Sequence, residues 1–113
     1  LSFWATWCVP CRAEMTSLQI LYEAYKDAGL AVLAVSIDPS ESAVRSFAAE
    51  KGLTFPVLLD PDKEAYFDAY AVLVLPTSFL IDRNGNITRT ILGDAAWESA
   101  DMKNAVLKLL RKK

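Results

Sequence analysis

The sequence contains no histidine, and its 113 residues include only two cysteines. Without an imidazole, the chain cannot use histidine-based acid–base catalysis or Ser–His and Cys–His nucleophile pairs, and it lacks the usual ligand of zinc and copper sites. No apolar run approaches the ~20 residues that a membrane-spanning helix needs. The net charge is −2, with both signs interleaved, so charge gives no reason to expect a nucleic-acid partner.

The composition that remains is typical of one globular domain. Hydrophobic residues make up 53% of the chain, and the length suits a single domain over residues 1–113. The chain begins at Leu1 inside an apolar run typical of a buried strand, so we expect it to be a segment of a longer protein. The basic residues at the other end, Lys108 and 111–113, are interpreted as the solvated end of a terminal helix.

Hydrophobic patterning predicts alternating strands and helices. Strands are expected over residues 1–5 and 30–38 and within 55–62, and helices over 9–28, 63–70 and 98–111, with a further helix ending at Gly52. The residues on either side of Asn84–Gly85 predict a hairpin. This order predicts an α/β domain with a central mixed β-sheet, its early strands parallel and its hairpin antiparallel, flanked by helices.

Two shorter segments carry further predictions, a helix cap and an apolar stretch. For the helix that ends at Gly52, Asp38 is the expected N-cap, with Pro39 in the first turn and Glu41 completing a capping box. The apolar residues 72–75 are expected to form either a buried strand or part of a surface groove.

Both cysteines lie in the segment FWATWCVPCRAEM, residues 3–15. Cys8 falls at the predicted strand-to-helix turn, where backbone N–H groups and the helix dipole favour a thiolate. With 100° per residue, Cys11 lies on the same stripe of the helix as Met15 and Leu18, so it should face the core. This arrangement favours a redox pair in which Cys8 attacks a disulfide and Cys11 resolves the mixed disulfide.

Other interpretations remain at this point. A structural disulfide across so short a loop contributes little stability, and two cysteines supply only half of a zinc site unless two chains share the metal. The cysteines could also be two unrelated buried thiols. Glu14, one turn from Cys11 at the edge of its stripe, either acts with the cysteines or simply complements the helix dipole.

The segment FWATWCVPCRAEM resembles the active-site segment of the thioredoxin superfamily in its TlpA/ResA-like branch, whose pattern is FWATWC-x-PC-x-x-E-x-P. The resemblance continues in order through LAVLAVSID, FPVLLDPD, LPTSFLID with the following NG, and the spacing of Gly93 and Trp97, and it covers nearly the entire chain. It implies a thioredoxin-like fold whose first central strand is truncated at the N-terminus of this chain.

The resemblance also implies catalytic roles. Cys8 would be the nucleophilic thiol, Cys11 the buried resolving thiol, and Glu14 an acidic residue that tunes their protonation.

Supporting roles follow from the same resemblance. Pro10 would help to set the potential of the dithiol, and Pro76 would be a cis-proline packed against the disulfide. Leu75 would offer its backbone to an extended substrate segment, and Trp7 would line the groove near Cys8.

The chain departs from the family pattern at several positions. Thr16 replaces the helix proline, so the usual kink is expected to be absent or milder. Leu73 and Val74 stand where relatives often carry Arg and Gly, which indicates either an altered substrate or tighter packing. Ala71, where Gly is frequent, is expected to be a neutral change.

The leading hypothesis is a protein disulfide reductase that needs no metal and no cofactor beyond its own disulfide. The resemblance implies client proteins that carry disulfides, apocytochrome c among the candidates, an upstream membrane thiol reductase, an extracytoplasmic location and a monomeric state. The alternatives are a dithiol oxidase or isomerase with the same residues, a peroxidase, and a module that binds Cu(I) through two thiols. Val9–Pro10 disfavours the oxidase, because strong oxidants of this superfamily commonly have His there. Thr6 disfavours the peroxidase, because the threonine of peroxiredoxins lies further from the reactive cysteine.

Overall fold

The computed structural model describes residues 1–111 and contains every type of element that the sequence predicts, in the predicted order. The helices are α1 (Val9–Tyr25), α2 (Glu41–Lys51) and α3 (Ala100–Arg111), with a 3₁₀ turn η1 (Lys26–Ala28) and a π-helical turn η2 (Glu64–Ala69). The strands are β1 (Ser2–Trp4), β2 (Ala34–Ser36), β3 (Val57–Leu59), β4 (Thr77–Ile81) and β5 (Ile87–Leu92). The predicted basic end lies partly outside the described residues, which stop at Arg111.

The strands form one mixed sheet in the order β3-β2-β1-β4-β5. β1, β2 and β3 pair in parallel, because helices connect them, whereas β4 is antiparallel to both β1 and β5. The predicted hairpin is confirmed: Gly85, with φ of 86°, lies in the turn between β4 and β5. The short β1 therefore lies at the centre of the sheet, where its end delivers the chain to the cysteine motif.

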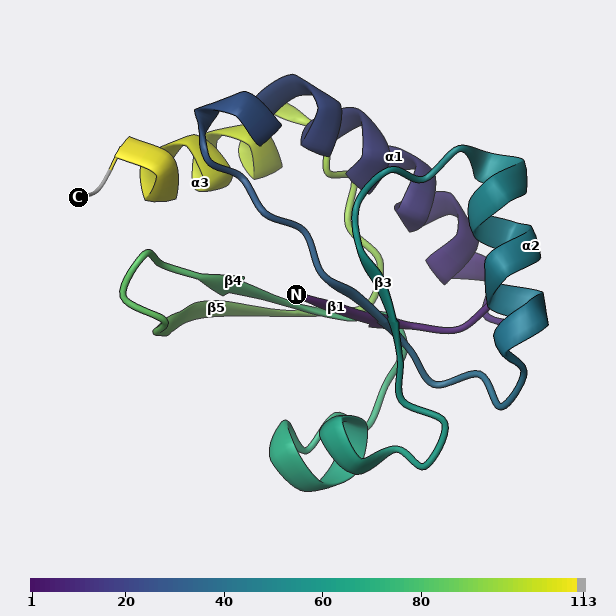
Figure 1. Ribbon diagram of the computed structural model, residues 1–113. Coiled ribbons are helices and arrows are strands. Elements are labelled where there is room, and N and C mark those ends of the chain that lie inside the picture. Colours follow the sequence, from purple (N-terminus) through teal and green to yellow (C-terminus); the bar gives the residue numbers. More distant parts are fainter. Residues whose placement is uncertain (112–113) are drawn as a thin grey trace.

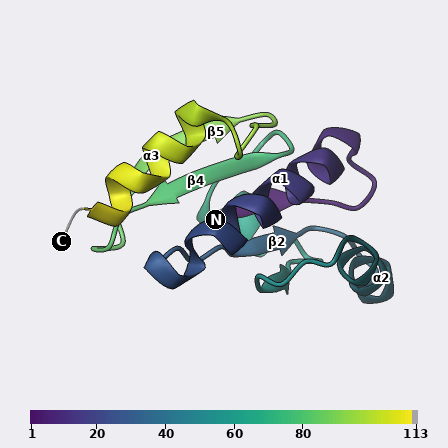
Figure 2. The same ribbon diagram turned by 90° about the horizontal axis from the view of Figure 1, so that it is seen from above.

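Helices cover both faces of this sheet. Figure 1 shows α1 and α3 on one side of the sheet and η2 on the other, and Figure 2 shows α2 beside α1. Successive side chains of β1 point to opposite faces: the Phe3 ring contacts Tyr66 of η2, and the Trp4 ring lies 5.1 Å from Phe47 of α2. Within residues 1–111, no helix is long and apolar enough to cross a membrane.

The first long helix and the strand after it are shorter than predicted. α1 ends at Tyr25, η1 continues for three residues, and Gly29 stops the turn with φ of 110°. Of the predicted strand 30–38, only Ala34–Ser36 pair in parallel with β1. The ladder is short because β1 itself offers only three residues.

The helix cap predicted at Asp38 is wrong. Ser40 is the N-cap of α2, and its hydroxyl accepts a hydrogen bond from the Ala43 N–H at 3.3 Å. Glu41 pairs with Arg45 at 2.7 Å instead of completing a capping box. Asp38 is buried, and its carboxylate binds Thr6 and Ser36 instead of the start of α2.

The segment before the predicted groove also differs from expectation. The predicted helix 63–70 is a π-helical turn over Glu64–Ala69, and residues 72–75 form no strand. Ala71, at its exit, has φ of 52°. This φ argues against the expectation that Ala71 is a neutral replacement of Gly, because a Cβ is disfavoured in the left-handed region.

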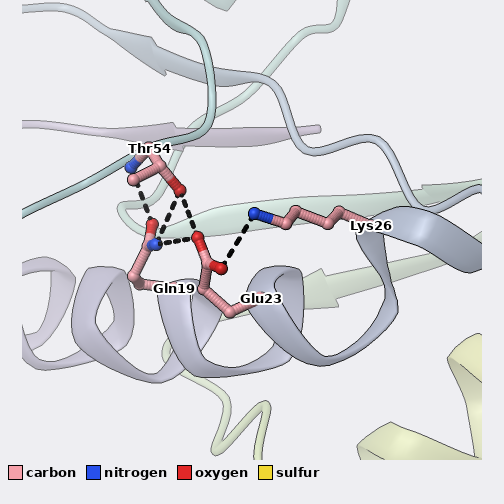
Figure 3. Close-up of polar contacts among 4 residues, drawn as sticks. All are labelled: Gln19, Glu23, Lys26 and Thr54. Atoms are coloured by element: carbon pink, nitrogen blue, oxygen red, sulfur yellow. Dashed lines mark hydrogen bonds and ion pairs between the residues drawn. The ribbon is translucent and has the colours of Figure 1, made fainter.

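Polar side chains tie the later half of α1 to the segment that leads into β3 (Figure 3). Gln19 and Thr54 exchange two hydrogen bonds of 2.7 and 2.9 Å. The Thr54 hydroxyl donates to Glu23 at 2.7 Å, and Glu23 pairs with Lys26 at 2.9 Å. This network fixes α1, and with it the cysteines at its start, against the edge of the sheet.

Candidate active site

Cys8 and Cys11 form a disulfide at the start of α1, with their Cα atoms 5.2 Å apart. Cys8 is the N-cap residue of the helix, and Pro10 lies in its first turn. Cys11 is fully buried and Cys8 is 8% exposed, so the predicted order of accessibility holds although Cys8 is itself nearly covered. In the described part of the chain, a partner sulfur can reach the disulfide through the opening beside Cys8.

That opening is an apolar groove. Trp7, Pro10 and Leu75, all singled out in the sequence, line it together with Cys8, and Trp7 is 64% exposed. The sequence motifs did not indicate the other lining residues, which come from distant segments: Ile37, Lys63, Tyr66 and Phe67. Lys63 is the charged residue of this lining, and its ammonium lies 5.9 Å from the centre of the Phe67 ring.

Pro76 follows the groove-lining residue Leu75 and is itself fully buried. The Leu75–Pro76 peptide bond is cis, as the family resemblance implied. The Pro76 carbonyl accepts a hydrogen bond of 2.9 Å from the Gly93 N–H, and the Thr77 hydroxyl donates to the Val74 carbonyl at 2.7 Å. The first bond holds the segment before β4 against the segment after β5, and the second closes the turn that leads into β4.

Glu14 is 1% exposed and lies one helical turn beyond Cys11. Its Oε1 accepts hydrogen bonds from Trp97 Nε1 at 2.7 Å and from the Ser78 hydroxyl at 3.1 Å. Burial raises the pKa of Glu14, and the bonds from Trp97 and Ser78 partly oppose that rise. The sequence indicated Glu14 and the position of Trp97, but it gave no sign that Trp97 and Ser78 bind this carboxyl.

Asp38 organises the turn that leads into Cys8. Its carboxylate accepts the Thr6 N–H at 2.9 Å and the Thr6 hydroxyl at 2.6 Å, and it also accepts the Ser36 hydroxyl. Thr6 stands two residues before Cys8. The carboxylate that the sequence suggested as a helix cap therefore fixes the backbone beside the disulfide.

The departures from the family pattern have visible consequences. Leu73 is 80% exposed and Val74 is 44% exposed, so tighter packing does not explain Leu73. α1 runs from Val9 to Tyr25 without a break at Thr16, in line with the expected absence of a proline kink.

The alternative of a metal site was also compared with the structure. Among residues 1–111, no group of three or more His, Cys, Asp or Glu side chains lies close enough to hold a metal ion.

Comparisons with known proteins identify the family of this chain. The AhpC/TSA family profile matches residues 1–90. The thiol-disulfide oxidoreductase ResA of Geobacillus kaustophilus is 42% identical over 101 residues, which are 89% of this chain and 58% of ResA. The chain thus spans a little over half the length of the curated relatives that it matches.

Solved structures share the fold over almost the whole chain. A Chlorobium tepidum protein assigned as the thiol:disulfide interchange protein DsbE has a TM-score of 0.88 and 33% identity, covering 96% of this chain and 77% of that protein. StoA of Bacillus subtilis has a TM-score of 0.79 and 30% identity, covering 93% of this chain and 78% of StoA. This chain belongs to the AhpC/TSA family, and it shares the thioredoxin-like fold of the solved thiol:disulfide interchange protein from Chlorobium tepidum.

Proposed function

We propose that this domain reduces disulfides in client proteins through its Cys8–Cys11 pair. The observation that carries the proposal is the disulfide at the start of α1, with Cys8 opening onto an apolar groove and Cys11 closed off behind it. The names of the relatives ResA and DsbE support the same chemistry.

The reaction uses two exchange steps. The Cys8 thiolate attacks one sulfur of the client disulfide, the client S–S bond breaks, and one client sulfur leaves with the electron pair. The Cys11 thiolate then attacks Cys8 in the mixed disulfide, and the second client sulfur leaves. The client gains two electrons and the domain ends as the Cys8–Cys11 disulfide, which a thiol donor must reduce again.

The other residues have supporting roles in this proposal. Trp7, Pro10 and Leu75 line the client groove. In this proposal the cis-proline Pro76 sets the path of the backbone at Leu75. Glu14, one helical turn from Cys11, takes up or releases a proton as Cys11 changes between its thiol and its disulfide form. No metal or further cofactor takes part.

The biological setting is proposed from the relatives. A membrane thiol reductase on the outer face of a cytoplasmic membrane would supply electrons to a monomeric, extracytoplasmic domain. Apocytochrome c is a suitable client, because its two haem-binding thiols must be reduced before haem attachment. No nucleic acid is expected as a partner.

The first measurement is the equilibrium reduction potential of the Cys8–Cys11 pair in glutathione and dithiothreitol buffers, followed by the fluorescence of Trp7. A value near or below about −270 mV supports a reductase, whereas a value near about −120 mV would reverse the proposed direction. No redox transition would reject the redox role and return attention to Cu(I) binding.

Client attack is tested with two single-cysteine variants. Cys11→Ser should accumulate a mixed disulfide between Cys8 and a disulfide client such as insulin, because the resolving thiol is gone. Cys8→Ser is the matched control and should trap little, since its remaining thiol is fully buried. Equal trapping by both variants would contradict the roles assigned to Cys8 and Cys11. A separate assay of peroxide consumption tests the peroxidase alternative.

A further inference from the structure

The two carboxyl oxygens of Glu14 have different surroundings, and this difference extends the function proposed above. Oε1 accepts two hydrogen bonds, from Trp97 and Ser78. Oε2 is buried and accepts no hydrogen bond of ordinary geometry in the described part of the chain, although the Ala95 backbone is close enough to lower the pKa of the carboxyl. Ionised, Glu14 would leave a charged oxygen unsolvated at Oε2. Protonation at Oε2 removes this cost, so Oε2 is better suited than Oε1 to take up a proton.

Trp97 is held firmly where it meets Glu14. Its side chain is 2% exposed, and its backbone N–H donates to the Ser17 hydroxyl of α1 at 2.9 Å. The same loop, residues 93–99, begins at Gly93, whose N–H binds the Pro76 carbonyl at 2.9 Å. The loop thus joins the segment that carries Leu75 and Pro76 to the buried carboxyl.

The loop also supplies most of the groups that act on Glu14. Burial by the surrounding core is the largest influence and raises the pKa of Glu14. The Trp97 indole lowers it most, the negative charge of Asp94 raises it, and the Ala95 backbone lowers it. The remaining influence is the Ser78 hydroxyl from β4, which lowers it. An indole N–H favours the ionised carboxylate because it can only donate.

We propose that Trp97 is a positioning residue for the dithiol chemistry: its indole N–H holds Oε1 of Glu14, leaves Oε2 to exchange the proton, and so sets the pH range in which Glu14 serves the Cys8–Cys11 pair. This inference rests on the proposed function. In the resolving step, the Cys11–Cys8 bond forms, the client sulfur leaves with the electron pair of the broken bond, and the Cys11 proton passes to Oε2.

Trp97→Phe is the main test. The variant keeps an aromatic ring and removes the N–H donor, so the ionised carboxylate loses its shortest hydrogen bond. The titration midpoint of Glu14, followed by the ¹³C shift of its carboxyl carbon, should rise by about one pH unit, which is a tenfold change in proton affinity. The pH dependence of the exchange equilibrium with glutathione should move in the same direction.

Trp4→Phe is the matched control. Trp4 is also a fully buried indole, but its Nε1 has no hydrogen-bond partner among residues 1–111. Trp4→Phe removes the same atoms from the core as Trp97→Phe, but it removes no hydrogen bond to Glu14. The Glu14 midpoint should stay at its wild-type value.

Two further variants keep the inference testable if Trp97→Phe does not fold. Ser78→Ala should raise the midpoint by less than Trp97→Phe, and Asp94→Asn should lower it. In a Glu14→Gln background, Trp97→Phe should leave the pH profile of glutathione exchange unchanged, because the titrating group is absent.

The inference is overturned if the Glu14 midpoint of Trp97→Phe equals that of the Trp4→Phe control. It is also overturned if Ser78→Ala does not raise the midpoint and Asp94→Asn does not lower it. A wild-type protein without any redox transition in glutathione would instead defeat the proposed function. The ¹³C titration would still report the bond between Trp97 and Glu14, so the two failures are distinguishable.

Discussion

At the residue scale, individual side chains fix the backbone on both sides of the client groove. The Asp38 carboxylate binds the backbone and hydroxyl of Thr6, just before the disulfide. Across the groove, the Asp60 carboxylate accepts the N–H groups of Ala65 and Tyr66 at 3.2 and 2.8 Å. Both carboxylates are buried, so each replaces water as the partner of backbone groups at the site.

Ala71 is the residue at which we expect a substitution to stabilise the fold. Its φ of 52° strains a residue with a Cβ, and glycine removes that strain. Because glycine also loses more entropy on folding, we expect Ala71→Gly to raise the free energy of unfolding by up to about 1 kcal/mol. Urea unfolding of the oxidised protein measures this change.

Ala69→Gly is the matched control for that prediction. Ala69 lies inside η2, where no positive φ is found. Glycine there brings only its entropic cost, so stability should fall by about 0.5–1 kcal/mol. A loss of stability in both variants would show that the backbone at Ala71 is not strained.

At the scale of elements, the segment between η2 and β4 presents apolar side chains to solvent beside the disulfide. Leu73 and Val74 are exposed and lead directly into Leu75, which lines the groove. From the start of α1, Trp7 and Val9 are also exposed, at 64% and 77%. Exposed apolar residues gathered around a reactive group are typical of a binding surface.

We predict that Leu73 contributes to client binding and not to the redox chemistry. Leu73→Arg should lower kcat/KM for the reduction of insulin about tenfold, which corresponds to a partial loss of the contact that a buried leucine makes. Its exchange with dithiothreitol should keep the wild-type rate, because a small dithiol does not need the surface. Paired rate measurements of the two reactions test this.

Ile87→Arg provides the control on another element. Ile87 is 49% exposed at the far end of the hairpin from Pro76. The substitution adds the same charge outside the groove, so both rates should stay near wild type. An equal loss of insulin reduction in both variants would mean that charge, and not the apolar surface, governs client binding.

At the scale of the whole molecule, the sequence predicted what depends on neighbouring residues and missed what depends on distant ones. The helix start at Cys8, the hairpin at Gly85 and the mixed sheet follow from local patterning and turn residues. Asp38 was predicted as the cap of α2 because a capping pattern considers only neighbouring residues. It cannot reveal that the fold brings Thr6 to the Asp38 carboxylate. The bond between Glu14 and Trp97 joins residues 83 positions apart, and only the assembled fold brings them together.

Two carboxyls of α1 should give the folded protein opposite responses to pH. Burial raises the pKa of Glu14 above its ordinary 4.5, so the folded state binds its proton more tightly than the unfolded state. This contribution to stability is complete below about pH 4.5 and is lost as the pH rises through the folded pKa. The Thr54 and Lys26 bonds lower the pKa of Glu23, so its contribution is present above about pH 4.5 and is lost as the pH falls through the folded pKa.

Urea unfolding of the oxidised protein across a pH series separates the two effects. Relative to wild type, Glu14→Gln should gain stability as the pH rises, because the amide cannot ionise, and the difference should persist in high salt. Glu23→Gln should be less stable than wild type only at higher pH, and added salt should shrink this difference because Glu23 and Lys26 are solvent-exposed. A pH-independent offset between Glu14→Gln and wild type would contradict a raised pKa at Glu14. Curves that diverge in opposite directions would show that the carboxyl beside Cys11 reduces stability when it is ionised, as expected for a buried group retained for its proton chemistry.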